Sequence, residues 1–239
     1  MPHVELPGDV RIRYDERGPR DARPLVLAHG FSVSLEMWFP QMHVLSQDYR
    51  LITWDARGHG GSTAPGEPED YSMPLLASDL RGLLDALDAT EGAIIGGMSF
   101  GGMIATQYAV DYASDVHALI LSDTTTSGPD PLPARSTRDQ EWSGDPGMEG
   151  GWRAILTRPD LTDELKDLDI PTLVIVGTED EMILPGLHRL DGLPRRRLLR
   201  MAGCFHGTSS QRPRDWGAEV LRFLRDVDAG AALGEDEVR

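Results

Sequence analysis

Short apolar runs alternate along this chain with segments in which apolar residues recur at helical spacing. Several of the runs lack the polar alternation of a half-exposed strand, which is typical of strands that are buried on both faces of a sheet. The runs that predict strands are residues 24–28, 51–54, 93–95, 116–121, 170–177 and 197–201. Helical spacing predicts helices over residues 37–45, 74–87, 103–112, 161–168, 185–193 and 216–227.

The N-terminal pattern differs, because residues 4–6 and 10–14 alternate between apolar and polar positions around Pro7-Gly8-Asp9. This arrangement predicts an antiparallel hairpin at a sheet edge. The regular alternation of strands and helices after it predicts an α/β fold, with a mostly parallel sheet of about eight strands and helices on both faces.

Residues 125–159 interrupt this regularity with many prolines and glycines. We expect this stretch to be a short cap or lid over the carboxyl ends of the strands. The core would then comprise residues 1–124 and 160–228, and residues 229–239 would form an acidic tail.

The composition narrows the possible partners. A formal net charge of −16 argues against nucleic acid and against an anionic membrane, because both require a basic surface. The single cysteine, Cys204, allows no internal disulfide, and no zinc-ligand cluster or other metal site is evident. No signal peptide and no apolar run of ~20 residues is evident, so we expect a cytoplasmic monomer or homodimer without a membrane partner.

The sequence Gly97-Met98-Ser99-Phe100-Gly101 lies between a predicted buried strand and a predicted helix. A serine on a sharp strand-to-helix turn requires a strained backbone and small neighbours two positions away. This is the nucleophile elbow pattern, in which Ser99 is the candidate nucleophile.

Acyl transfer also requires N–H donors for the developing oxyanion. The turn His29-Gly30-Phe31 follows another predicted strand, and we assign the donors to the backbone N–H groups of Phe31 and Phe100. For the His29 side chain we favour a structural role that braces this loop.

Two further candidates follow the last two predicted strands. His206 would accept the Ser99 proton and return it to the leaving group, and Asp180 would orient His206 and stabilise its charged form. Asp123, also at a strand end, is the rival for the acid. The other reading of His206 is an ordinary surface-loop histidine, and that of Asp180 is a helix N-cap.

The Gly-rich loop at residues 55–62 permits a phosphate-binding interpretation, because glycines expose N–H groups. It lacks the lysine and the glycine spacing of the known phosphate motifs. Structural bracing by Asp55 and Arg57 is the better interpretation.

Taken together, these motifs resemble the α/β-hydrolase superfamily, and within it the small bacterial esterases, enol-lactonases and cofactor-free haloperoxidase-like proteins. The resemblance rests on residues 29–31, 55–60, 97–102, 177–180 and His206. Serine at position 99 differs from the aspartate of the haloalkane dehalogenase and epoxide hydrolase branches. The short cap differs from the family's larger caps and implies an open site.

The predicted activity is hydrolysis of a small-molecule carboxylic ester or lactone through an acyl-enzyme, without a metal or organic cofactor. Trp38 and Met98 are candidate apolar contacts for the substrate. Carbon–carbon bond hydrolysis, or perhydrolysis of the haloperoxidase type, would use the same triad. An alternative of another class is a ligand-binding protein that keeps the fold without turnover.

Overall fold

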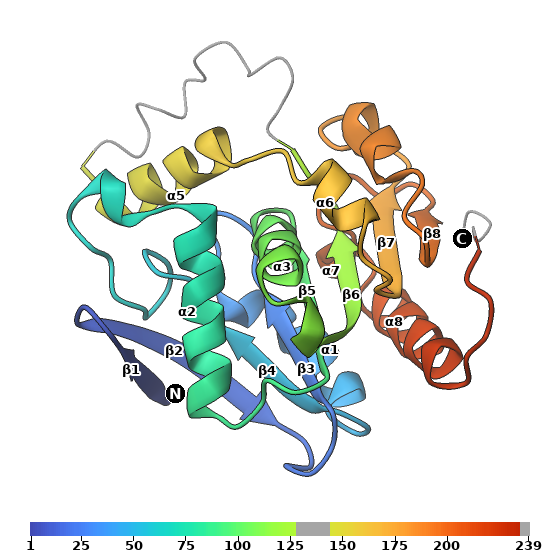
Figure 1. Cartoon of the computed structure of the whole chain (residues 1–239), viewed down its shortest axis with the longest axis horizontal. Coiled ribbons are helices and arrows are strands. Elements are labelled where there is room, and N and C mark those ends of the chain that lie inside the picture. The colour runs from blue at the N-terminus through green and yellow to red at the C-terminus, as the bar shows by residue number, and fades with distance from the viewer. Residues whose placement is uncertain (128–143, 235–239) are drawn as a thin grey trace.

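The structure is a computed structural model that describes residues 1–127 and 144–234. Its centre is an eight-stranded sheet with the strand order β1-β2-β4-β3-β5-β6-β7-β8 (Figure 1). The strands are β1 His3–Leu6, β2 Val10–Arg17, β3 Pro24–Ala28, β4 Arg50–Trp54, β5 Ala93–Met98, β6 Val116–Ser122, β7 Thr172–Gly177 and β8 Arg196–Met201.

The sheet is antiparallel only at its N-terminal edge. β1 pairs with β2 and β2 with β4 in antiparallel register, whereas β4, β3, β5, β6, β7 and β8 run parallel to one another. The strand order reverses between β3 and β5, and ligands of such sheets bind beyond the strand carboxyl ends at such a reversal. The predicted hairpin and the mostly parallel eight-stranded sheet are therefore confirmed.

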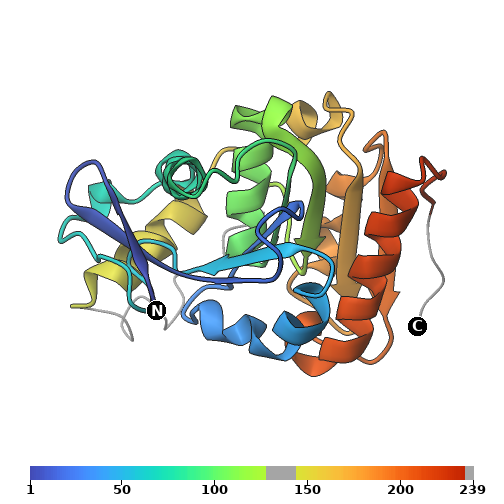
Figure 2. The same cartoon turned by 90° about the horizontal axis from the view of Figure 1, so that it is seen from below.

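Helices cover both faces of the sheet, and each face has its own apolar core (Figure 2). Helices α2 Met73–Ala86 and α3 Phe100–Asp111 lie on one face, and α1 Phe39–Leu45 and α8 Pro213–Asp228 lie on the other. The five central strands are almost fully buried, which explains their uninterrupted apolar sequences.

The remaining elements connect these layers. They are η1 Leu35–Trp38, η2 Pro68–Asp70, η3 Ala113–Asp115, α5 Pro146–Thr157, α6 Thr162–Lys166, η4 Leu184–Leu190 and α7 Thr208–Gln211. The segment predicted as helix at 185–193 is a 3₁₀ helix, and the one-turn helix α7 has no counterpart among the sequence predictions.

Helix α5 is the helical part of the predicted cap among the described residues, and residues 128–143 of that cap lie outside them. It packs beside η2 (Figure 1), where the backbone of Gly147 lies against Gly58 and Gly150 lies against the Tyr71 ring. A Cβ at either glycine would overlap these neighbours, so the small residues allow the close approach. The side chain of Asp145 caps the helix by accepting the N–H groups of Gly147 and Met148.

None of the helices in the described ranges combines the length and the apolar character needed to cross a bilayer.

Candidate active site

Ser99 occupies the sharp turn between β5 and α3, with φ 53° and ψ −113°. This backbone conformation is sterically costly for a residue with a side chain. A Cβ at Gly97 would overlap the backbone of Gly101, and a Cβ at Gly101 would overlap the carbonyl of Ala28. The two glycines of the motif are thus required by close backbone contacts, as the sequence pattern predicts.

His206 and Asp180 lie beside this serine. The Nε2 atom of His206 is 3.0 Å from the Ser99 Oγ, and its Nδ1 atom is 2.9 Å from Asp180 Oδ2. When Nδ1 carries the proton and donates it to the carboxylate, the Nε2 lone pair can accept the Ser99 hydroxyl proton. The His206 side chain remains 26 % exposed, so the reacting edge of the site is accessible.

Asp180 is fixed on both of its oxygens. Its side chain is 1 % exposed, and Oδ1 accepts the N–H groups of Met182 at 3.1 Å and Ile183 at 3.2 Å. Because Oδ2 is then left for His206, the carboxylate can hold one orientation of the imidazole. The structure brings together the three residues that were predicted as a triad, from the ends of β5, β7 and β8.

The loop after β3 orients the Phe31 N–H. His29 Nδ1 donates to the Gly30 carbonyl oxygen at 2.7 Å. Since the peptide bond is trans, the Phe31 N–H points to the opposite side from that carbonyl, away from His29. The Phe100 N–H is the first of helix α3 and belongs to the donors that a helix leaves unpaired.

His29 itself is held in one neutral form. Its Nε2 atom accepts the Ala56 N–H at 3.0 Å, which leaves the proton on Nδ1, and burial lowers the pKa of His29. The centroids of the His29 and His59 rings are 5.0 Å apart. Burial, and electrostatic repulsion from His29, lower the pKa of His59 to about 3. Both rings are therefore neutral near pH 7, and His29 acts as the brace that the sequence analysis favoured.

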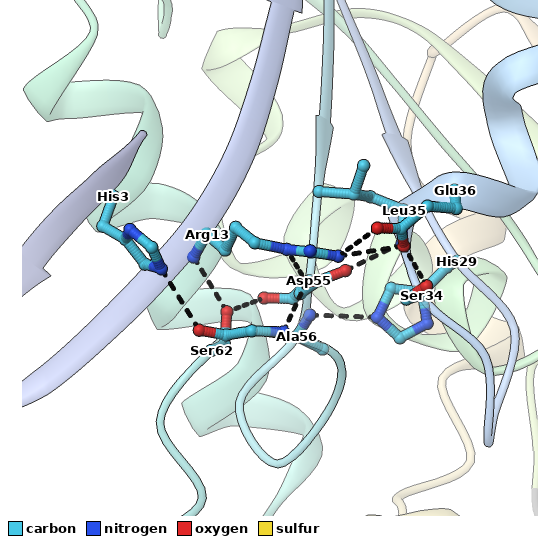
Figure 3. A network of polar contacts seen from close by, with 10 residues as sticks. His3, Arg13, His29, Ser34, Leu35, Glu36, Asp55, Ala56 and Ser62 are labelled. Atoms are coloured by element: carbon cyan, nitrogen blue, oxygen red, sulfur yellow. Dashed lines mark hydrogen bonds and ion pairs between the residues drawn. The ribbon is translucent and has the colours of Figure 1, made fainter. Parts of the chain in front are cut away.

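Asp55 anchors the same loop through a polar network (Figure 3). Its Oδ1 accepts the Leu35 N–H at 2.7 Å, and its Oδ2 pairs with Arg13, whose guanidinium also contacts Glu36 at 2.7 Å. Gly61 donates its N–H to Asp55 at 2.8 Å, so this glycine serves the network. These contacts support bracing over phosphate binding.

Arg57 has a separate buried partner. Its guanidinium forms two hydrogen bonds with Asp79, at 2.5 and 2.6 Å. Sequence reasoning missed the partners Arg13, Glu36 and Asp79. The available signal for Asp79 was its place among the buried apolar positions of helix α2. Arg13 occupies a regular polar position of its alternating strand and gave no such signal.

The two predicted substrate contacts have different positions. Met98 is 7 % exposed and lies beside Gly30 and Gly207, between the loop after β3 and the loop of His206. Trp38 is fully buried, with its ring 5.3 Å from that of Trp216, in the core between η1 and α8. The prediction for Trp38 was wrong, because a side chain without exposed surface cannot contact a substrate.

Among the residues that the structure describes, no group of three or more His, Cys, Asp or Glu side chains is arranged to hold a metal ion.

Known proteins share this architecture. Residues 23–167 match the family model described as the alpha/beta hydrolase fold. The non-heme chloroperoxidase of Burkholderia pyrrocinia is 28% identical, with 94% of this chain and 100% of that protein covered. A bifunctional esterase/perhydrolase of Acinetobacter calcoaceticus is 26% identical over the same shares.

A solved structure of a known protein has a similar fold. The enol-lactonase from Burkholderia xenovorans LB400 superposes with a TM-score of 0.81 at 24% identity, covering 94% of this chain and 100% of that one. The family model spans more than half of the chain, and the mostly parallel eight-stranded sheet agrees with that fold. This chain therefore belongs to the alpha/beta hydrolase fold family.

Proposed function

We propose that this protein is a serine hydrolase that cleaves a small-molecule carboxylic ester or lactone through an acyl-enzyme. The observation that carries the proposal is the continuous contact from Ser99 Oγ to His206 Nε2 at 3.0 Å and from His206 Nδ1 to Asp180 at 2.9 Å. The serine hydroxyl is a weak nucleophile on its own and becomes effective when a base removes its proton during attack.

In the acylation step, the Ser99 oxygen attacks the ester carbonyl carbon while its proton moves to His206 Nε2. The carbonyl oxygen becomes an oxyanion that the N–H groups of Phe31 and Phe100 stabilise. When the tetrahedral intermediate collapses, the carbon–oxygen bond to the alcohol breaks and His206 returns the proton to the leaving alkoxide. The products are the acyl-enzyme and an alcohol.

Deacylation repeats the sequence with water. His206 takes one proton from the attacking water and returns it to Ser99 as the bond between Ser99 and the acyl group breaks. Asp180 stabilises the imidazolium in both steps and keeps the proton on Nδ1. The carboxylic acid leaves, and in a lactone the same molecule carries both the acid and the alcohol.

The proposal is tested by hydrolysis of p-nitrophenyl acetate and p-nitrophenyl octanoate. Ser99→Ala should abolish turnover, whereas Ser114→Ala, an exposed serine before β6, should leave it unchanged. Turnover that persists in Ser99→Ala would contradict the proposal. The preference between the two chain lengths would measure how much acyl group the site accepts.

Perhydrolysis is a second candidate, favoured by the similarity to a chloroperoxidase and to an esterase/perhydrolase. Hydrogen peroxide would replace water in deacylation, so that the acyl-enzyme yields a peracid and free Ser99. The peracid can then oxidise a halide to hypohalous acid and revert to the carboxylic acid. Bromination of monochlorodimedone that requires acetate, peroxide and Ser99 would support this activity.

A further inference from the structure

The turn formed by the last residue of β6 and the two residues after it, residues 122–124, holds the backbone on both sides of Ser99. The Ser99 N–H donates to the Ser122 carbonyl oxygen at 2.9 Å, and the Thr124 hydroxyl donates to the Ser99 carbonyl oxygen at 2.8 Å. The strained backbone of the nucleophile is therefore fixed from outside its own strand and helix.

The same turn also holds the loop that carries His206. Asp123 Oδ2 accepts the N–H of Thr208 at 2.9 Å and its hydroxyl at 2.7 Å. Thr208 comes two residues after His206 and begins helix α7. Ser122 Oγ supports the arrangement, because it donates to Asp123 at 3.0 Å and accepts the indole N–H of Trp216 at 3.1 Å.

Asp123 keeps an unusual backbone conformation in this position. Its φ is 49°, in the left-handed region, and its N–H donates to the Ile175 carbonyl oxygen at 2.8 Å. Such a conformation in a non-glycine residue persists where the surroundings determine it strongly. It places the side chain toward Thr208 and not toward the solvent, with 0 % of the residue exposed.

Few polar groups contact the Asp123 carboxylate. In the part of the chain that the structure describes, Oδ1 has no hydrogen-bond partner and neither oxygen meets a lysine or arginine. Burial raises the pKa of Asp123 to about 6, and the Thr208 contacts and His206 oppose this rise. Burial raises the pKa of the Cys204 thiol, the charge of Arg212 opposes this rise, and the Asp123 charge adds to it.

We propose that Asp123 is a second positioning carboxylate for His206. Through Thr208 it fixes the histidine loop relative to Ser99, and its negative charge stabilises the imidazolium that forms when Ser99 attacks. It does not replace Asp180, which occupies His206 Nδ1. This inference rests on the proposed function and adds a residue to it.

Asp123→Asn tests both parts of the proposal, because it keeps the shape and removes the charge. The rate of hydrolysis of p-nitrophenyl acetate, and the rate at which a fluorophosphonate labels Ser99, are measured against pH. We expect both rates to fall about 10–100-fold at high pH. The acid limb of both profiles should move to lower pH by about half a unit or more, because a negative charge beside the imidazolium is lost.

Two further variants separate the effects. Asp88→Asn is the matched control, since Asp88 is an exposed aspartate with a similar φ of 50°, and it should leave both profiles unchanged. Thr208→Val removes the anchoring hydroxyl and keeps the Asp123 charge. It should lower both rates by about 3–10-fold without moving the acid limb.

A folded Asp123→Asn protein with rates within about threefold of the wild type would overturn the inference. A fall in rate with an unmoved acid limb would also overturn it, in favour of a purely structural aspartate. If Asp123→Asn does not fold, a Thr208→Val protein with wild-type rates would overturn it. If the wild type neither hydrolyses esters nor is labelled at Ser99, the proposed function fails as well.

Discussion

Four aspartates are buried in the described part of this protein, and they fall into two regions with different partners. Near the end of β4, Asp55 pairs with Arg13 and Asp79 pairs with Arg57. At the ends of β6 and β7, Asp123 and Asp180 meet backbone N–H groups, hydroxyls and one histidine, and no arginine among the described residues.

The difference in partners indicates a difference in role, because one pair of aspartates supports the fold and the other pair adjoins the proposed catalytic histidine. A carboxylate paired with a guanidinium has its charge already neutralised, so Asp55 and Asp79 hold parts of the fold together. A buried carboxylate without a cation can stabilise a positive charge that appears only during a reaction. The two acids that lack a cation both adjoin the loop of His206, where the proposed mechanism creates an imidazolium.

The largest effect is expected at Asp180. Asp180→Asn should lower kcat for p-nitrophenyl acetate by about 10³–10⁴-fold, because an amide favours the wrong histidine tautomer and does not stabilise the imidazolium. KM should change little, since no substrate contact is removed. Steady-state kinetics checks this, and a variant with more than about a tenth of wild-type kcat would show that another residue supplies the acid.

Asp79 should affect stability and leave catalysis intact. Asp79→Asn leaves the Arg57 guanidinium buried without its anion and should lower the free energy of unfolding by about 3–5 kcal/mol. The measurement is urea denaturation, with kcat determined at a temperature where the variant is folded. A large loss of kcat in a folded variant would remove the distinction between the two regions.

Asp123 should make stability depend on pH. Burial raises its pKa from 3.8 to about 6, so between these values the folded protein binds more protons than the unfolded chain. The contribution of Asp123 to the free energy of unfolding therefore falls by up to about 3 kcal/mol as pH rises through this window. Asp123→Asn has no carboxyl group at this position and should not show this fall.

The free energies of unfolding of wild type and Asp123→Asn are compared at about pH 4 and about pH 7. At the higher pH, the free energy of unfolding of Asp123→Asn should increase relative to that of the wild type. The difference in unfolding free energy between Asp88→Asn and the wild type should be the same at both pH values. A constant difference for Asp123→Asn would mean that its carboxyl titrates alike in the folded and unfolded states.

The smallest effect is the coupling between the two acids. If Asp123 and Asp180 both act on the His206 ring, the effect of Asp123→Asn should be smaller in the Asp180→Asn background. There we expect the second substitution to lower kcat by less than about fivefold. A double-mutant cycle of kcat measures this. Effects that multiply fully would indicate that the two residues act independently.

The sequence predicted the elements that depend on local pattern. The buried strands, the amphipathic helices and the elbow at Ser99 all follow from residue spacing or from glycines whose role is local. His206 and Asp180 could be predicted because loops that follow parallel strands gather at one edge of the sheet.

The sequence could not predict contacts between distant loops. Thr208 gives no motif, and its role appears only when the fold places it against Asp123, which sequence reasoning weighed as the rival acid. Trp38 illustrates the converse error, because an aromatic residue near a site loop is apolar in either role and only packing against Trp216 assigns it to the core. Whether a single side chain is buried depends on tertiary packing, which the local sequence pattern does not show.

The acyl-enzyme can be observed directly. Wild-type protein is mixed with p-nitrophenyl acetate, quenched with acid within milliseconds to seconds, digested and examined by mass spectrometry, with Ser99→Ala and Ser114→Ala in parallel. We predict one acetyl group on the peptide that contains Ser99 in the wild type and in Ser114→Ala, and none at this position in Ser99→Ala. Release of p-nitrophenol that continues in Ser99→Ala, or an acetyl group only on another residue, would contradict the account.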